Sequence, residues 1–374
     1  MRSRLVHWAP SLLLSATYAA DVSAEYGLNM PRGVTDISHS VYDLHMTIFW
    51  ICVAIGVVVF GVMFYSIFKH RKSKGAVASQ FHESTVVEVL WTIVPVVILV
   101  AMAWPATKTL VEMYDTADSE VDIKVTGYQW KWRYEYLGSG VDFFSNMSTP
   151  KEEIYNTQSK NENYLLEVDN ELVVPINKKI RFLITANDVI HSWWVPDFAV
   201  KKDAIPGFIN ESWTRINEPG IYRGQCTELC GKDHGFMPIV VRAVEVEEYE
   251  KWILAKQEEA RAEAELAKLT FTLEEQMARG EQVYNTNCAA CHQANGAGIP
   301  PAFPALKDSA IALGPVDKHI EIVVNGVAGS AMQAYGGQLS DVDMAAVITY
   351  ERNAWGNDTG DNVSAKDIVE FKKK

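Results

Sequence analysis

The stretch CTELCGKDHGFM gathers four soft metal ligands within twelve residues: Cys226, Cys230, His234 and Met237. A further imidazole, His191, stands upstream in HSWWVPDF, after a strand-like run. Thiolate, imidazole and thioether ligands select copper, whereas zinc prefers closed sets of cysteine and histidine. A mononuclear electron-transfer copper needs only one cysteine, so the second sulfur predicts two copper ions bridged by both cysteines. Sharing one electron over two metals would lower the reorganisation that each transfer requires.

A second cluster, CAACH, contains Cys288, Cys291 and His292, the attachment motif of c-type haem. Two thioether bonds would hold the porphyrin, His292 would bind the iron, and the loop QANGAGIPPAFPAL would form a pocket wall. For the second axial ligand we predict Met332, in a loop before the last helix; the competitor Met344 lies inside an amphipathic helix, where a core role is expected. His/Met ligation raises the haem potential and leaves no open position, which favours electron transfer.

The alternative interpretation is that each cysteine pair forms a structural disulfide, as is common in exported proteins. Only five cysteines are present, and the fifth, Cys52, lies inside an apolar run. Each pair is followed by a histidine at metal-site or haem-site spacing, which favours the cofactor interpretation. A thioredoxin-like redox CxxC is disfavoured because no βαβ pattern surrounds the second pair.

Two apolar runs must anchor these sites. Residues 44–68 and 86–104 are long enough, as helices, to cross a bilayer, and Pro95 in the second is tolerated in membrane helices. Between them lies a basic segment with Lys69, Arg71, Lys72 and Lys74. The positive-inside rule places this loop in the cytoplasm and both chain ends outside. Two buried helices of a soluble protein are the alternative.

The remaining chain is predicted to form two extracytoplasmic domains. Short runs rich in β-branched and aromatic residues between 121 and 246 predict a β-sandwich or Greek-key barrel. Residues 247–272 have the Ala, Glu and Lys composition of an exposed helical linker. Residues 273–357 form a small helical domain by pattern, with Ser340 capping the last helix and Asp343 in its first turn. The tail, 358–374, gives no signal.

The ends of the sequence and its charge add context. Residues 1–20 resemble a secretory signal peptide, with Arg2 and Arg4 before a short apolar segment; a disordered leader is the alternative. The net charge of −13 disfavours nucleic acid as a partner. An acidic surface suits a basic redox protein better.

The motif Cys-x-Glu-Leu-Cys-Gly-x-x-His-x-x-Met, an upstream His-Ser-Trp and two preceding spans resemble subunit II of cytochrome c oxidase over residues 40–245. CAACH and its surroundings resemble class I cytochromes c over residues 275–356. This resemblance implies a two-helix transmembrane hairpin over 40–105, a cupredoxin β-sandwich over 121–246 and a small all-α cytochrome c domain over 273–357. The implied binuclear CuA centre uses six residues, listed in chain order: His191, Cys226, Glu228, Cys230, His234 and Met237.

Other positions carry family roles by resemblance only. Glu228 would bind copper through its backbone carbonyl and face a magnesium site shared with subunit I. Trp130, in GYQWKW, would accept electrons from cytochrome c; an exposed strand aromatic is the alternative, because a fused haem can move the entry route. Glu88 would lie near the mouth of a proton channel, or be an interfacial residue. Many members have arginine where Phe208 stands, so Phe208 receives no role.

The implied function is that of the electron-entry subunit of a haem-copper oxidase, in which subunit I reduces oxygen to water with proton translocation. Electrons would pass from a donor cytochrome through haem c and CuA. Expected partners are oxidase subunits I and III, the donor cytochrome and the lipid bilayer of a bacterial inner membrane. Three alternatives remain: a quinol oxidase subunit, an assembly protein with a relic cupredoxin domain, and a nitrous-oxide reductase. The first two would lack copper ligands, and the third would lack the two-span anchor.

Overall fold

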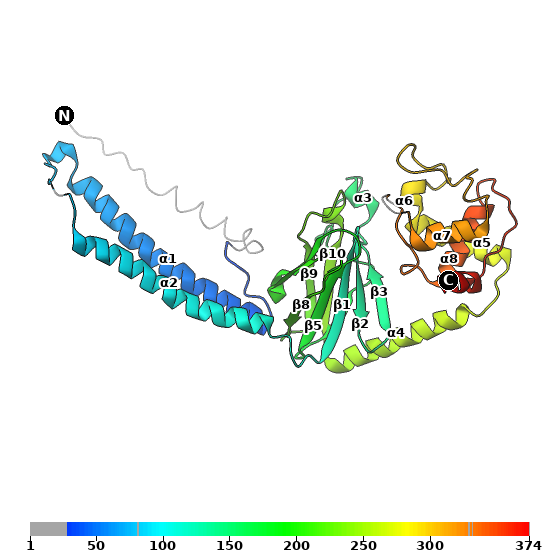
Figure 1. The fold of residues 1–374 in the computed structure, drawn as a ribbon, viewed down its shortest axis with the longest axis horizontal. Helices are drawn as coiled ribbons and strands as arrows, with labels where there is room; N and C mark the ends of the chain where they lie inside the picture. Colours follow the sequence, from blue (N-terminus) through cyan, green and yellow to red (C-terminus); the bar gives the residue numbers. More distant parts are fainter. Residues whose placement is uncertain (1–27, 81, 328–329, 331, 374) are drawn as a thin grey trace, which may run out of the picture. The chain divides into compact units, whose positions relative to one another are not determined.

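The computed structural model describes residues 28–80, 82–327, 330 and 332–373 (Figure 1); the signal peptide predicted for residues 1–20 lies outside this part of the chain. The chain divides into two compact units. Among the described residues, the first comprises 28–138 and 145–249, and the second comprises 139–144 and 250–373.

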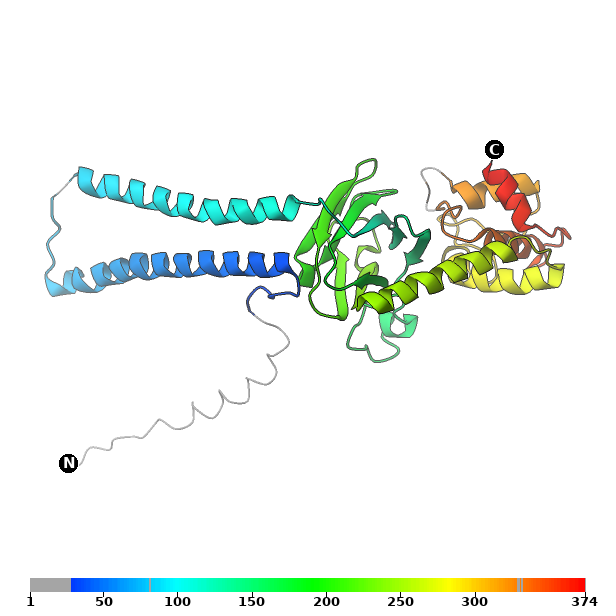
Figure 2. The same ribbon diagram turned by 90° about the horizontal axis from the view of Figure 1, so that it is seen from below.

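Two long helices form the hairpin at the start of the first unit, side by side in both views (Figures 1 and 2). Helix α1 spans Asp36–Lys69 and α2 spans Thr85–Tyr114, with the 3-10 turn η1 (Lys72–Lys74) in the loop between them. Both are long and apolar enough to cross a membrane, and the side chains of their apolar stretches are exposed. In a bilayer, lipid chains would contact these exposed apolar side chains. The two helices contain the two predicted spans, residues 44–68 and 86–104.

Both helices are tied to the sandwich at the ends away from that loop. The N-cap of α1, Thr35, is fully buried and donates through Oγ1 to the carbonyl of Phe198 at 3.1 Å. At the end of α2, the indole of Trp213 donates to the carbonyl of Glu112 at 3.0 Å. These two contacts fix the sandwich to the end of the hairpin that lies opposite the α1–α2 loop.

The strands form a sandwich of two five-stranded sheets. One has the order β3-β2-β1-β5-β8 and the other β4-β10-β9-β6-β7. The pairs β1–β5 and β10–β4 are parallel, which requires connections that cross between the sheets, as in a Greek key. The strand bounds are β1 Val121–Tyr128, β2 Lys131–Tyr136, β3 Val141–Ser145, β4 Leu172–Pro175, β5 Ile180–Ala186, β6 His191–Val195, β7 Val200–Ala204, β8 Asn210–Thr214, β9 Gly220–Cys226 and β10 Pro238–Val244.

The core between the sheets consists of alternating residues of these strands: in β2, for example, every second residue is buried and the others are half-buried. Its largest buried side chains include Trp132, Trp193 and Phe182. Short helical turns interrupt the connections: α3 (Lys151–Ile154), η2 (Pro196–Phe198) and η3 (His234–Phe236). The run 121–136, which reads as continuous β sequence, is a hairpin that turns at Gln129 and Trp130.

Helix α4 (Val246–Leu266) leads into the helical second unit, whose members are α5 (Leu273–Asn287), α6 (Ala289–His292), α7 (Val316–Asn325), α8 (Asp341–Asn353) and α9 (Ala365–Lys372). Helices α5 and α8 cross closely because Gly280 has no side chain: a Cβ there would meet the Ala346 carbonyl oxygen at 2.2 Å. The predicted cap of α8 is confirmed, since the Ser340 hydroxyl accepts from the Asp343 amide.

The C-terminal residues, for which no structure is predicted from the sequence, pack against α8. Asn357 donates to the carbonyls of Leu306 and Glu351, and Ile368 in α9 is fully buried. We call residues 357–372 the C-terminal strap. It closes one side of the helical core.

Candidate copper and haem sites

Strand pairing brings the upstream histidine to the cysteine loop. In the register of β6 with β9, Trp193 lies opposite Cys226, and the amide of Thr227 donates to the carbonyl of Ser192. His191 begins β6 and lies on the same face as Trp193, two residues away. The loop from Cys226 to β10 then returns His234 and Met237 to the same place.

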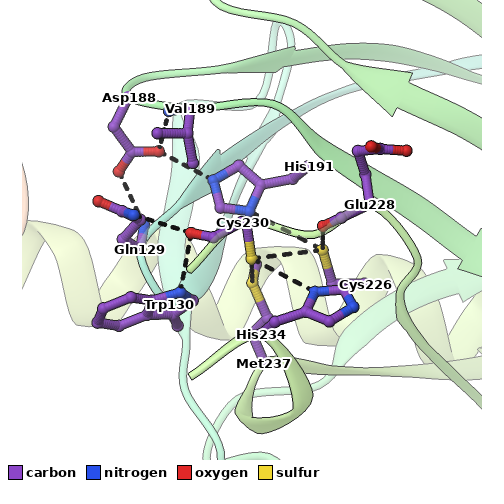
Figure 3. Close-up of polar contacts among 10 residues, drawn as sticks. All are labelled: Gln129, Trp130, Asp188, Val189, His191, Cys226, Glu228, Cys230, His234 and Met237. Carbon is purple, nitrogen blue, oxygen red and sulfur yellow. Dashed lines mark hydrogen bonds and ion pairs between the residues drawn. The ribbon is translucent and has the colours of Figure 1, made fainter. Parts of the chain in front are cut away.

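Figure 3 shows the donor atoms of this cluster pointing toward one another. The two sulfurs, Sγ of Cys226 and Sγ of Cys230, lie 3.9 Å apart, and both cysteines are free thiols. The ligand atoms of His191, Cys226 and Cys230 all lie within 4.8 Å of one another.

Each sulfur has its own imidazole and its own weaker donor. Cys226 Sγ contacts His191 Nδ1 at 3.9 Å and the carbonyl oxygen of Glu228 at 3.4 Å. Cys230 Sγ contacts Nδ1 of His234 at 3.5 Å and Sδ of Met237 at 3.6 Å. Two similar sets of donors that share a central sulfur pair suit two soft metal ions better than one. The donor set therefore fits a binuclear copper centre.

Asp188 orients the buried imidazole. Its Oδ1 lies 2.9 Å from Nε2 of His191, and its Oδ2 accepts from the amide of Gln129 at 2.8 Å. Nε2–H is therefore the donor to the carboxylate, and Nδ1 is left with its lone pair toward the sulfurs. Burial opposes ionisation of Asp188, but hydrogen bonds from His191, Val189 and Gln129 prevail and lower its pKa.

The two thiols differ in acidity. Burial raises the pKa of Cys226, but contacts with His191 and backbone amides outweigh it and lower that pKa. Burial and the neighbouring Cys226 raise the pKa of Cys230 to about 12. Two sulfurs at this separation resist double ionisation, so a cation between them is needed to stabilise two thiolates.

Trp130 and Gln129 contact the backbone of the cysteine loop. Both the indole Nε1 of Trp130 and the amide Nε2 of Gln129 donate to the carbonyl of Cys230, at 3.2 and 2.8 Å. Trp130 also packs on Gly231, and Nζ of Lys232 lies 5.6 Å from its ring centroid. The half-buried indole thus has a direct hydrogen bond to a residue of the cluster.

Glu88 and the side chain of Glu228 lie elsewhere. Glu88 is exposed in the first turn of α2, where the amide of Ser84 approaches its Oε1 at 3.4 Å. The Glu228 carboxylate is exposed and points away from the sulfurs in Figure 3, while its carbonyl faces Cys226.

In the second unit, the residues of CAACH open onto a cavity of about 300 Å³. Helix α5 begins at a capping box formed by Thr272 and Glu275, and it delivers Cys288 at its C-terminal end. Nδ1 of His292 donates to the carbonyl of Pro304 at 2.8 Å, which leaves Nε2 as the metal-binding nitrogen. A mostly apolar cavity with two thiols and one oriented imidazole fits a covalently bound haem.

The two methionines are placed differently. Met332 lines this cavity. Met344 is fully buried in the core that α8 forms with its neighbours, and it is not among the described residues lining the cavity.

Sequence reasoning missed residues that support both sites. Asp188 stands three residues before His191, in an Asn-Asp pair that by itself indicates only a turn. Gly127 is also required: a Cβ there would meet Cδ2 of His191 at 2.8 Å. In the haem cavity, His319 and Glu351 are buried polar residues with no sequence signal beyond their presence in helical patterns.

Comparison with known proteins supplies the family. Residues 121–244 match the family model described as the periplasmic domain of cytochrome c oxidase subunit II, and residues 23–109 match its transmembrane domain. Residues 275–350 match a model described as subunit III of cbb3-type cytochrome c oxidase. The chain is 38% identical to a "Probable cytochrome c oxidase subunit 2" of Rickettsia bellii, over 69% of this chain and 94% of that protein.

Two further similar proteins are also named as subunit II of a cytochrome oxidase. A cytochrome c oxidase subunit 2 of Cyanidium caldarium is 36% identical, over 63% of this chain and 93% of that protein. The crystal structure of the periplasmic domain of subunit II of cytochrome oxidase from Bradyrhizobium japonicum is 43% identical, covers 38% of this chain and 98% of that chain, and has a TM-score of 0.35. This chain belongs to the cytochrome c oxidase subunit II family, as a membrane-anchored member with a fused C-terminal cytochrome c domain and an electron-transfer role in a haem-copper oxidase.

Proposed function

We propose that the chain is the electron-entry subunit of a proton-translocating cytochrome c oxidase. In this proposal an external donor cytochrome delivers electrons to the domain of residues 273–357. They pass to the domain of residues 121–246 and then to the haem centres of subunit I, where oxygen becomes water. The observation that carries the proposal is the convergence of two imidazoles, two thiols, a thioether and a carbonyl at one place in the sandwich.

The proposed copper ligands are the two sulfurs of Cys226 and Cys230, the Nδ1 atoms of His191 and His234, the sulfur of Met237 and the carbonyl of Glu228. A bound copper pair supplies one-electron redox chemistry. The protein holds the ligands so that little moves between oxidation states: His191 is fixed by Asp188, and Met237 is only 2% exposed. Such rigidity lowers the cost of each transfer.

The proposed haem ligands are the thioether-forming Cys288 and Cys291, the imidazole of His292 and the sulfur of Met332. A bound haem supplies a second one-electron carrier. An apolar cavity excludes water from it, and His/Met ligation gives it a high potential. The 247–272 linker keeps this carrier at high local concentration.

Trp130 is the proposed entry point for electrons that reach the copper domain. Its support is the 3.2 Å hydrogen bond from its indole to the backbone carbonyl of Cys230, whose sulfur is one of the proposed copper ligands. The alternative is that electrons reach the copper domain without passing through Trp130, because the haem of the fused cytochrome c domain would be their direct donor.

The proposed setting is a bacterial inner membrane, with both soluble domains on the periplasmic side and oxidase subunits I and III as partners. The basic α1–α2 loop supports this orientation. Glu88 is the proposed residue of a proton path, since a carboxylate in an apolar helix is costly unless it has a use. The Glu228 carboxylate is proposed to bind magnesium together with subunit I.

The deciding experiment counts copper and covalent haem in the purified oxidase, wild type and Cys226→Ser. Two coppers in this chain and one covalent haem are expected in the wild type. The variant should lose the near-infrared copper band and electron flow to oxygen, while the haem is still reduced by the donor. Oxidase activity that survives Cys226→Ser contradicts the proposal, and so does a copper-free wild-type chain, which a quinol oxidase subunit would give.

A further inference from the structure

A buried acid–base pair lines the haem cavity. His319 in α7 and Glu351 in α8 both face it, and their side chains are only 2% and 5% exposed. Nε2 of His319 lies 2.8 Å from Oε2 of Glu351. Buried ionisable groups are costly, and a haem cavity wall is usually apolar, so this pair calls for an explanation.

The hydrogen bonds of the pair indicate its charge. Nδ1 of His319 is buried and has no hydrogen-bond partner among the described residues. A proton on Nδ1 would be a buried cationic donor without an acceptor, which is unfavourable. The neutral tautomer, with Nε2–H donating to Glu351, avoids this cost. The pair then carries one negative charge, on the carboxylate.

Three polar side chains close to Glu351 make hydrogen bonds to other groups. The hydroxyls of Tyr284 and Tyr335 donate to the carbonyls of Gln293 and Asn287. The guanidinium of Arg352, the next residue in α8, bonds to Asp361 and to the carbonyl of Gly314.

The carboxylate also lies against the sulfur that would carry the haem. Burial raises the pKa of the Cys288 thiol, and the negative charge of Glu351 and a hydrogen bond between the thiol and that carboxylate raise it further. The thiol proton is lost when a thioether forms, so this contact cannot neutralise Glu351 in the mature protein. His319 then remains its donor.

We propose that Glu351, held in place by His319, fixes one buried negative charge beside the haem and sets its reduction potential below the value that an apolar wall would give. Reduction removes one positive charge from the iron, so a nearby anion stabilises the oxidised form. The pair would thus poise the first carrier to give up its electron to the copper domain. This inference rests on haem attachment at Cys288 and Cys291, which belongs to the proposed function.

The test is the midpoint potential of haem c in the full-length chain within the oxidase. Glu351→Gln keeps the shape and a hydrogen-bond acceptor but removes the charge. We expect a more positive potential, with a several-fold higher ratio of reduced to oxidised haem at a fixed ambient potential. The matched control is Glu321→Gln, which removes an exposed carboxylate from α7, the helix that carries His319. It should leave the potential unchanged.

A second variant tests the protonation state. Glutamine at position 319 can still donate to Glu351, so His319→Gln should leave the potential near that of the wild type. A marked fall in His319→Gln would mean that His319 carries a positive charge, and would overturn the proposal. An unchanged potential in Glu351→Gln would also overturn it.

If Glu351→Gln fails to accumulate haem, Glu351→Asp decides. It keeps the charge but withdraws it by one methylene group, so a smaller positive shift is expected, and a potential at or below the wild type would contradict the proposal. Covalent haem staining separates the two levels of the argument. A wild-type chain without covalent haem defeats the proposed function, whereas stained chains with unaltered potentials defeat only the role of the pair.

Discussion

The carboxylate of Asp188 lies 2.9 Å from Nε2 of His191, on the side of the imidazole opposite the two sulfurs. The same carboxylate accepts from the backbone amides of Val189 and Gln129. It therefore ties the loop after β5 and the turn between β1 and β2 to one ligand ring. A carboxylate in this position fixes the tautomer and strengthens the imidazole as a ligand.

We predict that Asp188→Ala weakens copper binding by roughly 10- to 100-fold, the usual effect of removing a carboxylate that orients a metal-bound histidine. The measurement is copper retention against a competing chelator. Asp233→Ala is the control, because Asp233 lies beside His234 in the chain but pairs only loosely with Lys232, at 3.7 Å. Equal copper retention in the two variants would show that the Asp188 contact is dispensable.

Gly127 is predicted to be intolerant of any side chain. A Cβ at this position would meet Cδ2 and Cγ of His191 at 2.8 and 3.0 Å, so the ring would have to move. Gly127→Ala should cost roughly 1–3 kcal/mol of stability, as overpacking does, and should perturb the near-infrared copper band. Gly235→Ala, in the cysteine loop itself, has open space around its Cβ and should do neither. A normal copper band in Gly127→Ala would mean that the ring is not held where the structure has it.

Met332 is predicted to be the second axial ligand of the haem. Met332→Ala should lower the haem potential and create a binding position for carbon monoxide, because a thioether ligand both raises the potential and fills the sixth site. Met344→Leu, a volume-conserving change in the core, should do neither. If Met344→Leu binds carbon monoxide and Met332→Ala does not, the assignment must be reversed.

The sequence predicts best what lies close together along the chain. The ligands between Cys226 and Met237, and the CAACH motif, are local, so their chemistry is readable without a fold. The apolar length of the two spans is equally local. His191 could be joined to the cysteine loop only through the family resemblance, because its position depends on the register of β6 with β9.

The remaining parts depend on contacts that no local pattern encodes. Strands β3, β6 and β7 have only five residues each, too few to show a period. Gly127 matters only because β1 passes beside the His191 ring. His319 and Glu351 stand 32 residues apart and meet through the packing of α7 on α8.

The C-terminal strap gives a prediction about acid stability. Arg352 in α8 has a side chain only 3% exposed, and it bonds to Asp361 of the strap and to the carbonyl of Gly314. Hydrogen bonds from Arg352 lower the pKa of Asp361 below its ordinary value of 3.8. A carboxylate with a depressed pKa stabilises the fold at pH above the ordinary value, and that stabilisation is lost as the pH falls through the depressed value.

Asp361→Asn should therefore destabilise the haem domain at neutral pH, because it leaves a buried guanidinium without its anion. The cost should be roughly 1–2 kcal/mol, less than for a fully buried pair, since the Asp361 side chain is 38% exposed. Thermal unfolding of the full-length protein, followed by haem absorbance, should show a lower midpoint at pH 7 than the wild type. The difference should shrink as the pH falls below 3.8, and it should vanish below the depressed pKa of Asp361, where the folded wild-type carboxyl is protonated as well. Asp358→Asn removes an exposed charge from the same strap and should match the wild type throughout; a pH-independent gap for Asp361→Asn would trace the loss to packing instead of charge.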